Sequence, residues 1–303
     1  MTHRPQRRRR RGRAAAMTAG ASLCVTALLA GCSGGGASED TPGTGGAART
    51  SSPRPTPVWN PSPGSVAAVG DSITRAFDAC TLLADCPEVS WATGTDTAVE
   101  SLALRLLGPG EVAGKTWNLA RTGARMAELP EQMAAAAAER PELVTVMMGA
   151  NDACRDRAEL MTPVADFRAS FTAALGRLRA GAPKAQVYVS SVPDLRRLWE
   201  TGRTSPTGRQ VWQLGVCGSM LKDPEDLSPA AERRRGQVRE RVVAYNQVLK
   251  EVCAKDVRCR YDGGAVFGFA FDQGQLSPWD FFHPSKDGQA RLAELAYRQI
   301  TRS

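Results

Sequence analysis

Short apolar runs alternate with amphipathic segments along the chain after residue 64. The run at 143–148 is apolar almost throughout, as expected of a strand buried on both faces of a sheet. Strands are expected at 65–69, 116–119, 143–148, 186–192 and 258–261. Helices are expected at 99–107, 130–139, 164–180, 230–252 and 286–300. This alternation predicts an α/β fold in which helices cover both faces of a central, mostly parallel sheet.

The segment 195–229 interrupts the alternation. It shows no clear period, although it contains several large apolar residues. Long loops inside compact domains usually have a function, so we expect this segment to contribute to one.

The first 31 residues have the composition of an export signal. Seven arginines and no acidic residue lie in this part, and an apolar stretch at 14–30 leads into Leu29-Ala30-Gly31-Cys32. A positive start, a short apolar core and small residues before a cut are typical of secretory signals. The last four residues resemble the lipobox of bacterial lipoproteins, which makes Cys32 the expected lipidation site. A plain secreted protein, cut at another small residue, is the alternative.

The chain therefore divides into three expected parts. A lipoprotein signal covers 1–31, and a flexible linker covers 32–64, where Gly, Ser, Thr, Ala and Pro are too abundant for a core to form. A single catalytic domain covers 65–303. We expect a monomer outside the cytoplasm, held at the bacterial membrane by its N-terminal lipid or secreted.

The net charge of +8 raises the question of a nucleic-acid partner. Subtracting the seven arginines of 1–31 leaves +1 for the rest of the chain. The positive charge is a local feature of the signal, and nucleic-acid binding is excluded for the mature domain.

Six cysteines remain after the signal and Cys32 are set aside. An even number in an oxidising compartment suggests disulfides, and six cysteines can pair in many ways. The simplest assignment joins neighbours along the chain: Cys80 to Cys86, Cys154 to Cys217, and Cys253 to Cys259. The absence of CxxC spacing and the scarcity of histidine argue against a zinc site.

Four short blocks carry the candidate chemistry. They read Gly-Asp-Ser-Ile-Thr at 70–74, Asn-Leu-Ala-Arg-Thr-Gly at 118–123, Gly-Ala-Asn-Asp at 149–152 and Asp-Phe-Phe-His at 280–283. The first three lie at the ends of expected strands. Because ligands bind beyond the carboxyl ends of parallel strands, these blocks should share one edge of the sheet.

Ser72 is the candidate nucleophile. It follows the first strand and is expected at the start of a helix, where its own N–H would point outward. Gly123 can offer a backbone N–H at close range, and Asn151 can offer its side-chain NH₂. With the N–H of Ser72, these groups could surround a developing oxyanion. Taken singly, each is more often a turn, a helix-entry glycine or a cap.

His283 is the candidate base. The chain has two histidines, and His3 would be removed with the signal. A base that works near neutral pH is most often histidine. Asp280 lies three residues earlier, so one turn could bring its carboxylate to the ring and hold the tautomer. A lone Asp-x-x-His is commonly a polar turn.

In this order, the four blocks resemble those of the SGNH/GDSL hydrolase family, and the resemblance covers about 65–303. It implies a flavodoxin-like three-layer α/β/α fold and hydrolysis of esters through an acyl-serine, without a metal or cofactor. It implies Ser72 as nucleophile, His283 as base and Asp280 as the group that orients the base. The implied oxyanion hole is formed by Ser72, Gly123 and Asn151.

The expected substrate is a carboxylic acyl ester, cleaved by an esterase or lipase. A carbohydrate O-acetylesterase of the same fold and a non-catalytic surface binding lipoprotein are the alternatives. The apolar residues of 195–229, with Trp279, Phe281 and Phe282, could line an acyl pocket. Ordinary packing is the other interpretation, and the sequence leaves both open.

Overall fold

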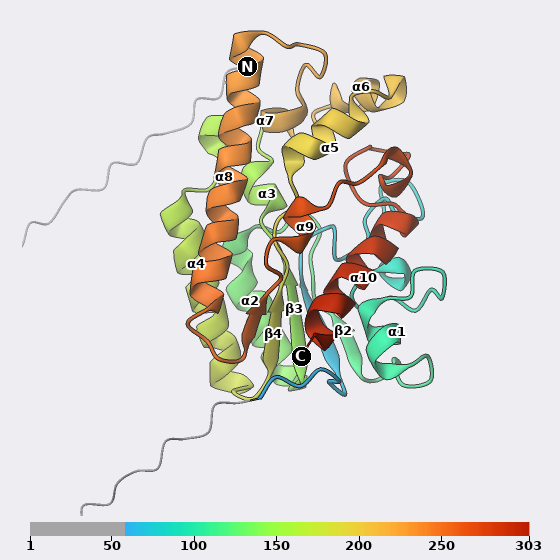
Figure 1. The fold of residues 1–303 in the computed structure, drawn as a ribbon, viewed down its shortest axis with the longest axis vertical. Coiled ribbons are helices and arrows are strands. Elements are labelled where there is room, and N and C mark those ends of the chain that lie inside the picture. Colours follow the sequence, from blue (N-terminus) through green and yellow to red (C-terminus); the bar gives the residue numbers. More distant parts are fainter. Residues whose placement is uncertain (1–57, 303) are drawn as a thin grey trace, which may run out of the picture. The chain divides into compact units, whose positions relative to one another are not determined.

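A computed structural model describes residues 58–302, and Figure 1 shows the fold. The expected signal, Cys32 and the expected linker up to residue 57 lie outside the described residues. The α/β architecture is confirmed, since a five-stranded parallel sheet has the order β2-β1-β3-β4-β5. The strands are β1 (Val66–Gly70), β2 (Thr116–Asn118), β3 (Leu143–Met147), β4 (Gln186–Val189) and β5 (Cys259–Tyr261). Every residue of β1, β3 and β4 is buried, as their apolar runs predict.

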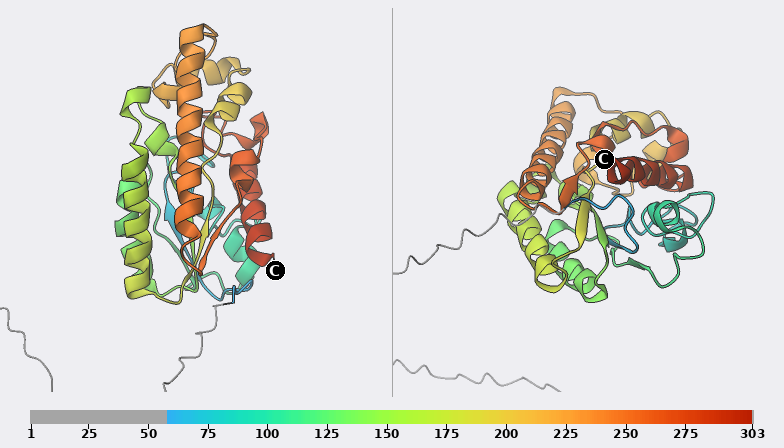
Figure 2. Two further views of the ribbon diagram at one scale, coloured as in Figure 1. Left: turned by 60° about the vertical axis from the view of Figure 1, so that its left-hand side comes forward. Right: turned by 60° about the horizontal axis from the view of Figure 1, so that its bottom comes forward.

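Helices cover both faces of the sheet (Figure 2). One layer contains α2 (Leu129–Glu139), α4 (Val164–Gly181) and α8 (Pro229–Cys253), in which α4 packs against both α2 and α8. The other layer contains α1 (Leu102–Leu107) and α10 (Lys286–Thr301). Short helices α3 (Ala150–Ala153) and α9 (Ala265–Gly268) follow β3 and β5. Single 3₁₀ turns lie at Pro87–Val89, Met126–Glu128, Ala158–Leu160 and Gln273–Gln275. No helix within 58–302 has the length and apolar character needed to cross a bilayer.

The strand expected at 186–192 is shorter in the structure. It leaves the sheet after Val189, because the Asp262 carboxylate accepts from both the N–H of Ser191 (3.0 Å) and its hydroxyl (2.7 Å). A side chain thus takes the place of the next ladder partner at the carboxyl end of β4.

The segment 195–229 is more regular than its sequence suggests. It forms three short helices, α5 (Leu195–Gly202), α6 (Pro206–Trp212) and α7 (Gly218–Leu221). Its large apolar side chains are mostly buried: Leu198, Trp199, Trp212, Met220 and Leu221. The Trp199 ring lies 4.0 Å from the guanidinium carbon of the buried Arg235. The burial of these five side chains supports ordinary packing as their role.

The end of the expected linker is attached to the domain. The indole N–H of Trp59 donates to the carbonyl of Ile300 (2.8 Å), and the N–H of Asn60 donates to the side chain of Gln186 (2.5 Å). These contacts place Trp59 and Asn60 within the folded unit, ahead of the boundary expected at residue 65.

Three disulfides join the cysteine pairs that the simplest assignment gives: Cys80–Cys86, Cys154–Cys217 and Cys253–Cys259. The second connects the end of α3 to the start of α7. It therefore fixes the 195–229 segment to the carboxyl end of β3.

The Cys154–Cys217 bridge should be the most stabilising of the three. Replacing both cysteines by serine should lower the free energy of unfolding by about 4 kcal/mol, because the bridge joins residues 63 positions apart and restricts the unfolded chain most. The matched control, Cys253→Ser with Cys259→Ser, opens a bridge of separation 6 and should cost about 2 kcal/mol. Urea unfolding of both double variants measures the difference, and equal losses would contradict this expectation.

Candidate active site

Ser72, His283 and Asp280 meet beyond the carboxyl end of β1. The Nε2 atom of His283 lies 2.8 Å from Oγ of Ser72, although the two residues are 211 positions apart. On the other side of the ring, Nδ1 lies 2.5 Å from Oδ2 of Asp280. All three groups are largely buried. This is the arrangement of a hydroxyl, a base and a carboxylate that orients the base.

The turn that carries Ser72 is tightly fitted to the sheet. Gly70 ends β1 with φ +153°, and a Cβ atom there would lie 2.3 Å from the carbonyl oxygen of Met147. The helix expected after Ser72 is absent, since residues 71–79 form successive turns. Ala76 and Asp78 both have left-handed φ (52° and 56°), which a right-handed helix cannot contain. The N–H of Ser72 therefore does not lie at a helix N-terminus.

His283 is held by a hairpin-like loop. Leu276 and Pro284 form an antiparallel bridge, and the N–H of Ser277 donates to the carbonyl of His283 at 2.7 Å. Within the loop, Phe281 adopts left-handed φ (51°). The indole N–H of Trp212 donates to the carbonyl of Asp280 at 2.9 Å. The α6 helix thus contacts the backbone that presents the candidate base.

The expected oxyanion donors lie in the Ser72 turn, in the loop after β2 and at the start of α3, and these three segments are hydrogen-bonded to one another. The N–H of Arg121 donates to the carbonyl of Gly70 (3.1 Å), and the Asn151 amide donates to the carbonyl of Ala124 (3.0 Å). Gly123, between them, has φ +82° and is exposed. Among the described residues, the backbone N–H groups of Ser72 and Gly123 donate to no other protein group. The Asn151 NH₂ retains one hydrogen beyond its contact with Ala124.

The Asp280 carboxyl remains ionised. Burial opposes its charge, but hydrogen bonds from the His283 ring and from the N–H groups of His283 and Phe282 outweigh burial and hold the pKa of Asp280 below its ordinary value of 3.8. A fixed negative charge next to the imidazole favours its protonated form during reaction.

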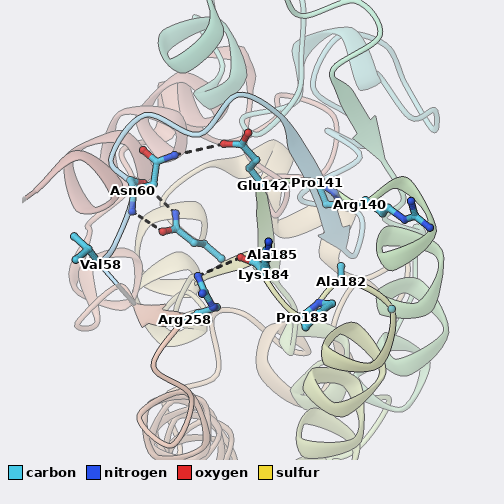
Figure 3. Close-up of a pocket in the computed structure, with 12 residues that line it drawn as sticks. Val58, Asn60, Arg140, Pro141, Glu142, Ala182, Pro183, Lys184, Ala185 and Arg258 are labelled. Atoms are coloured by element: carbon cyan, nitrogen blue, oxygen red, sulfur yellow. Dashed lines mark hydrogen bonds between the residues drawn. The ribbon is translucent and has the colours of Figure 1, made fainter. Parts of the chain in front are cut away.

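A cavity near the sheet does not coincide with these groups. A cavity of about 670 Å³ is lined by residues such as Asn60, Glu142 and Arg258, and it lies at the amino ends of β3 and β4 (Figure 3). Its lining contains no serine, threonine, cysteine or histidine. We therefore place the candidate active site at Ser72, on chemical grounds.

A family model of GDSL-like lipases and acylhydrolases matches residues 66–296, a span that includes all four sequence blocks. The chain belongs to this family. It is therefore an ester hydrolase, and the resemblance noted in the sequence is confirmed. No curated protein matches the chain.

Solved structures similar to this GDSL-like hydrolase include three enzymes. An alpha/beta hydrolase from the metagenome of Lake Arreo is 15% identical, with a TM-score of 0.47 over 79% of this chain and 96% of that one. An extracellular lipase from Streptomyces rimosus is 17% identical, with a TM-score of 0.44 over 77% and 99%. A family 3 carbohydrate esterase from Clostridium thermocellum is 14% identical, with a TM-score of 0.45 over 78% and 94%.

Two buried glutamines hold the Ser72 turn of this GDSL-like hydrolase, and neither was predicted from the sequence. The side chain of Gln132, from α2, accepts from the N–H of Gly70 (2.7 Å) and donates to its carbonyl (2.9 Å). The side chain of Gln289, from α10, donates to the carbonyl of Ile73 (2.9 Å) and accepts from the N–H of Trp91 (2.9 Å). Each glutamine lies on the apolar face of an amphipathic helix, which is the signal that could have revealed it.

Asp71, next to Ser72, is a buried acid with an incomplete set of partners. Its Oδ1 accepts from the N–H of Ile73 (3.0 Å), while Oδ2 is buried without a partner. Burial raises the pKa of Asp71 to about 7; the Ile73 N–H and His283 oppose the shift, and Asp152 adds to it. At neutral pH this carboxyl lies near the middle of its titration.

Asp71→Asn should reduce the pH dependence of stability. A carboxyl whose folded pKa is raised stabilises the fold below its unfolded value of 3.8 and loses that contribution as pH rises through about 7. The full loss corresponds to about 4 kcal/mol. Asparagine keeps an acceptor for the Ile73 N–H but cannot ionise. The free energy of unfolding of the variant, relative to wild type, should therefore increase between pH 5 and pH 8. If the free energies of unfolding of wild type and variant changed in parallel between pH 5 and pH 8, this expectation would be contradicted.

Proposed function

We propose that this chain is a serine esterase that cleaves carboxylic acyl esters through an acyl-serine intermediate. Ser72 is the nucleophile, His283 the general base and Asp280 the residue that orients the base. The observation that carries the proposal is the continuous contact from Ser72 Oγ through the imidazole to Asp280. Family membership supports the reaction class, and this contact supports the assignment of roles.

The reaction proceeds in two displacements. His283 takes the proton of Ser72, whose oxygen attacks the ester carbonyl carbon. The tetrahedral species collapses, the C–O bond to the alcohol breaks, and the imidazolium gives its proton to the leaving alcohol. Water, deprotonated by His283, then cleaves the acyl-serine and restores the free hydroxyl. Asp280 stabilises the imidazolium in both displacements.

The charge on the tetrahedral oxygen needs donors that are already in place. We assign this role to the N–H groups of Ser72 and Gly123 and to the side-chain NH₂ of Asn151. The hydrogen-bonding capacity left on all three supports the assignment. Such donors lower the barrier because they require little reorganisation when the charge forms.

Ser72→Ala should abolish ester hydrolysis while the fold persists, because alanine fits the same turn and removes only the attacking oxygen. Hydrolysis of p-nitrophenyl esters and covalent labelling by a fluorophosphonate measure the loss independently. Ser62→Ala is the matched control, since Ser62 is an exposed serine before the first strand. Substantial turnover or labelling by the Ser72→Ala variant would overturn the assignment.

Apolar side chains beside the imidazole support a substrate with an apolar acyl group. Phe77 and Phe282 place their rings 5.1 Å and 5.0 Å from the His283 ring, centroid to centroid. Trp279 is 43% exposed, and Leu82 and Leu83, in the disulfide loop that follows Phe77, are 54% and 74% exposed. Exposed apolar side chains around a site that binds ester are suited to cover a hydrocarbon chain.

Trp279→Ala should weaken hydrolysis of octanoyl esters more than that of acetyl esters. Loss of one large apolar contact should cost about 1.5 kcal/mol, or roughly tenfold in kcat/KM, for the longer chain only. Val257→Ala is the control, since Val257 is exposed (65%) just before the amino end of β5. A wild-type preference for acetyl esters, or an equal loss on both esters, would favour a carbohydrate O-acetylesterase instead.

We also propose that the domain functions outside the cytoplasm as a monomer. The three disulfides support an oxidising compartment. The sequence of 1–31 and the Leu-Ala-Gly-Cys run support export and lipidation of Cys32, with 32–57 as the tether between the membrane and the catalytic domain.

A further inference from the structure

A second buried carboxyl group lies beside the Asp280–His283 pair. An oxygen of Asp78, an oxygen of Asp280 and a ring nitrogen of His283 all lie within 4.8 Å of one another. Asp78 is 1% exposed. The mechanism proposed above for Ser72, His283 and Asp280 does not use Asp78. Burying a carboxyl group nevertheless costs a substantial amount of folding free energy.

The surrounding chain holds Asp78 in this place. Its N–H donates to the carbonyl of Ala84 (3.0 Å), and its Oδ1 accepts from the N–H of Leu83. The hydroxyl of Ser277, in the loop that carries His283, donates to the carbonyl of Asp78 (2.7 Å). The Cys80–Cys86 disulfide closes the same loop. Asp78 has left-handed φ, a conformation that aspartate accepts more readily than most residues.

Other charged groups lie near the two turns. Asp71, from the Ser72 turn, is buried, accepts from the Ile73 N–H through one oxygen only, and also interacts electrostatically with His283. Arg75 pairs with Asp85 (2.9 Å), and Lys286 pairs with Asp96 (2.7 Å). No cation among the described residues pairs with Asp78 within 4.0 Å. The imidazole is the basic group that faces it.

Asp78 holds its proton more firmly than an exposed aspartate. Burial raises the pKa of Asp78 above its ordinary value of 3.8; the Leu83 N–H opposes this shift, and the neighbouring Asp280 adds to it. The pKa of Asp280 is shifted in the opposite direction, below its ordinary value. As pH falls, Asp78 is therefore the first of the two carboxyls to become neutral.

We propose that Asp78 is a positioning residue for ester hydrolysis, a second carboxylate whose charge helps His283 to accept the Ser72 proton. The proposal rests on the function proposed above. Proton transfer from Ser72 creates a positive imidazolium in a poorly hydrated site, where a negative charge a few ångströms away is weakly screened. Asp280 supplies one charge by direct contact, and Asp78 supplies another without touching the transferred proton.

Asp78→Asn tests this role, because asparagine keeps an oxygen for the Leu83 N–H and removes only the charge. The acid limb of kcat/KM against pH should move to lower pH by about one unit, since the imidazole keeps its neutral form further into acid. The plateau rate should fall severalfold because the base is weaker. Asp78→Ser is also uncharged and should move the acid limb in the same direction. This variant replaces Asp78→Asn in the test if Asp78→Asn fails to fold.

A second readout avoids turnover. Because His3 and His283 are the two histidines of the chain, the ring-proton NMR signal of His283 can be followed in protein that lacks the first 31 residues. Its titration midpoint should move in parallel with the acid limb. Asp85→Asn is the matched control, since Asp85 lies in the same disulfide loop but pairs with Arg75, and its acid limb should match wild type.

The outcomes separate the two proposals. If Ser72→Ala is inactive but the acid limb and the NMR midpoint of Asp78→Asn coincide with wild type, the role of Asp78 is refuted and the esterase mechanism stands. An acid limb that moves to higher pH in Asp78→Asn would also refute the role of Asp78. A purely structural role would lower the melting temperature of Asp78→Asn and leave both midpoints unmoved. Activity in Ser72→Ala would refute the mechanism itself.

Discussion

The hydrogen bond between Ser72 and His283 depends on the alignment of two turns that the sheet alone does not align. β1 delivers Ser72 to the carboxyl edge, as a parallel strand should. The loop of His283 follows no strand directly, so it needs other supports. Ser277 fixes the His283 backbone, and Trp212 fixes the carbonyl of Asp280. Because a hydrogen bond weakens steeply with distance and angle, the contact between Ser72 and His283 depends on these supports.

The buried acids of this site differ in their hydrogen-bond donors and therefore in their pKa values, although they are chemically identical. Asp280 receives three hydrogen-bond donors, which keep it charged, whereas Asp71 and Asp78 receive one backbone donor each and bind their protons more tightly. Asp152 is also buried, with the N–H of Met126 as a donor. A site with several acids and one imidazole can thus hold the pKa of one carboxyl below its ordinary value, while the pKa values of its neighbours are raised.

The sequence predicts most of the sheet because buried parallel strands are short apolar runs bounded by turns, as at 143–148. It also identifies Ser72 and His283 as candidates because their chemistry is distinctive, and the structure brings these two side chains into contact. It does not predict α5 and α6, because two-turn helices are too short to show a period. Their caps were nevertheless visible: Asp194 accepts from the N–H of Arg196, and Ser205 precedes Pro206.

Two other features were not predicted from the sequence, for a different reason. Ala76 is a strong helix former, so its left-handed φ cannot be inferred from its identity. Gln132 and Gln289 are polar residues of a kind usually exposed to solvent, yet each satisfies backbone groups that the turn leaves open.

The 195–229 segment also supports the site through contacts that its sequence does not reveal. A Cβ on Gly202 would lie 2.5 Å from the Trp212 ring, so α5 and α6 are in close contact where Trp212 binds the Asp280 carbonyl. Segments that open easily have few buried contacts, whereas opening this one would break the support of the candidate base. The segment is therefore held firmly against the loop that carries His283, through Trp212 and through the Cys154–Cys217 disulfide.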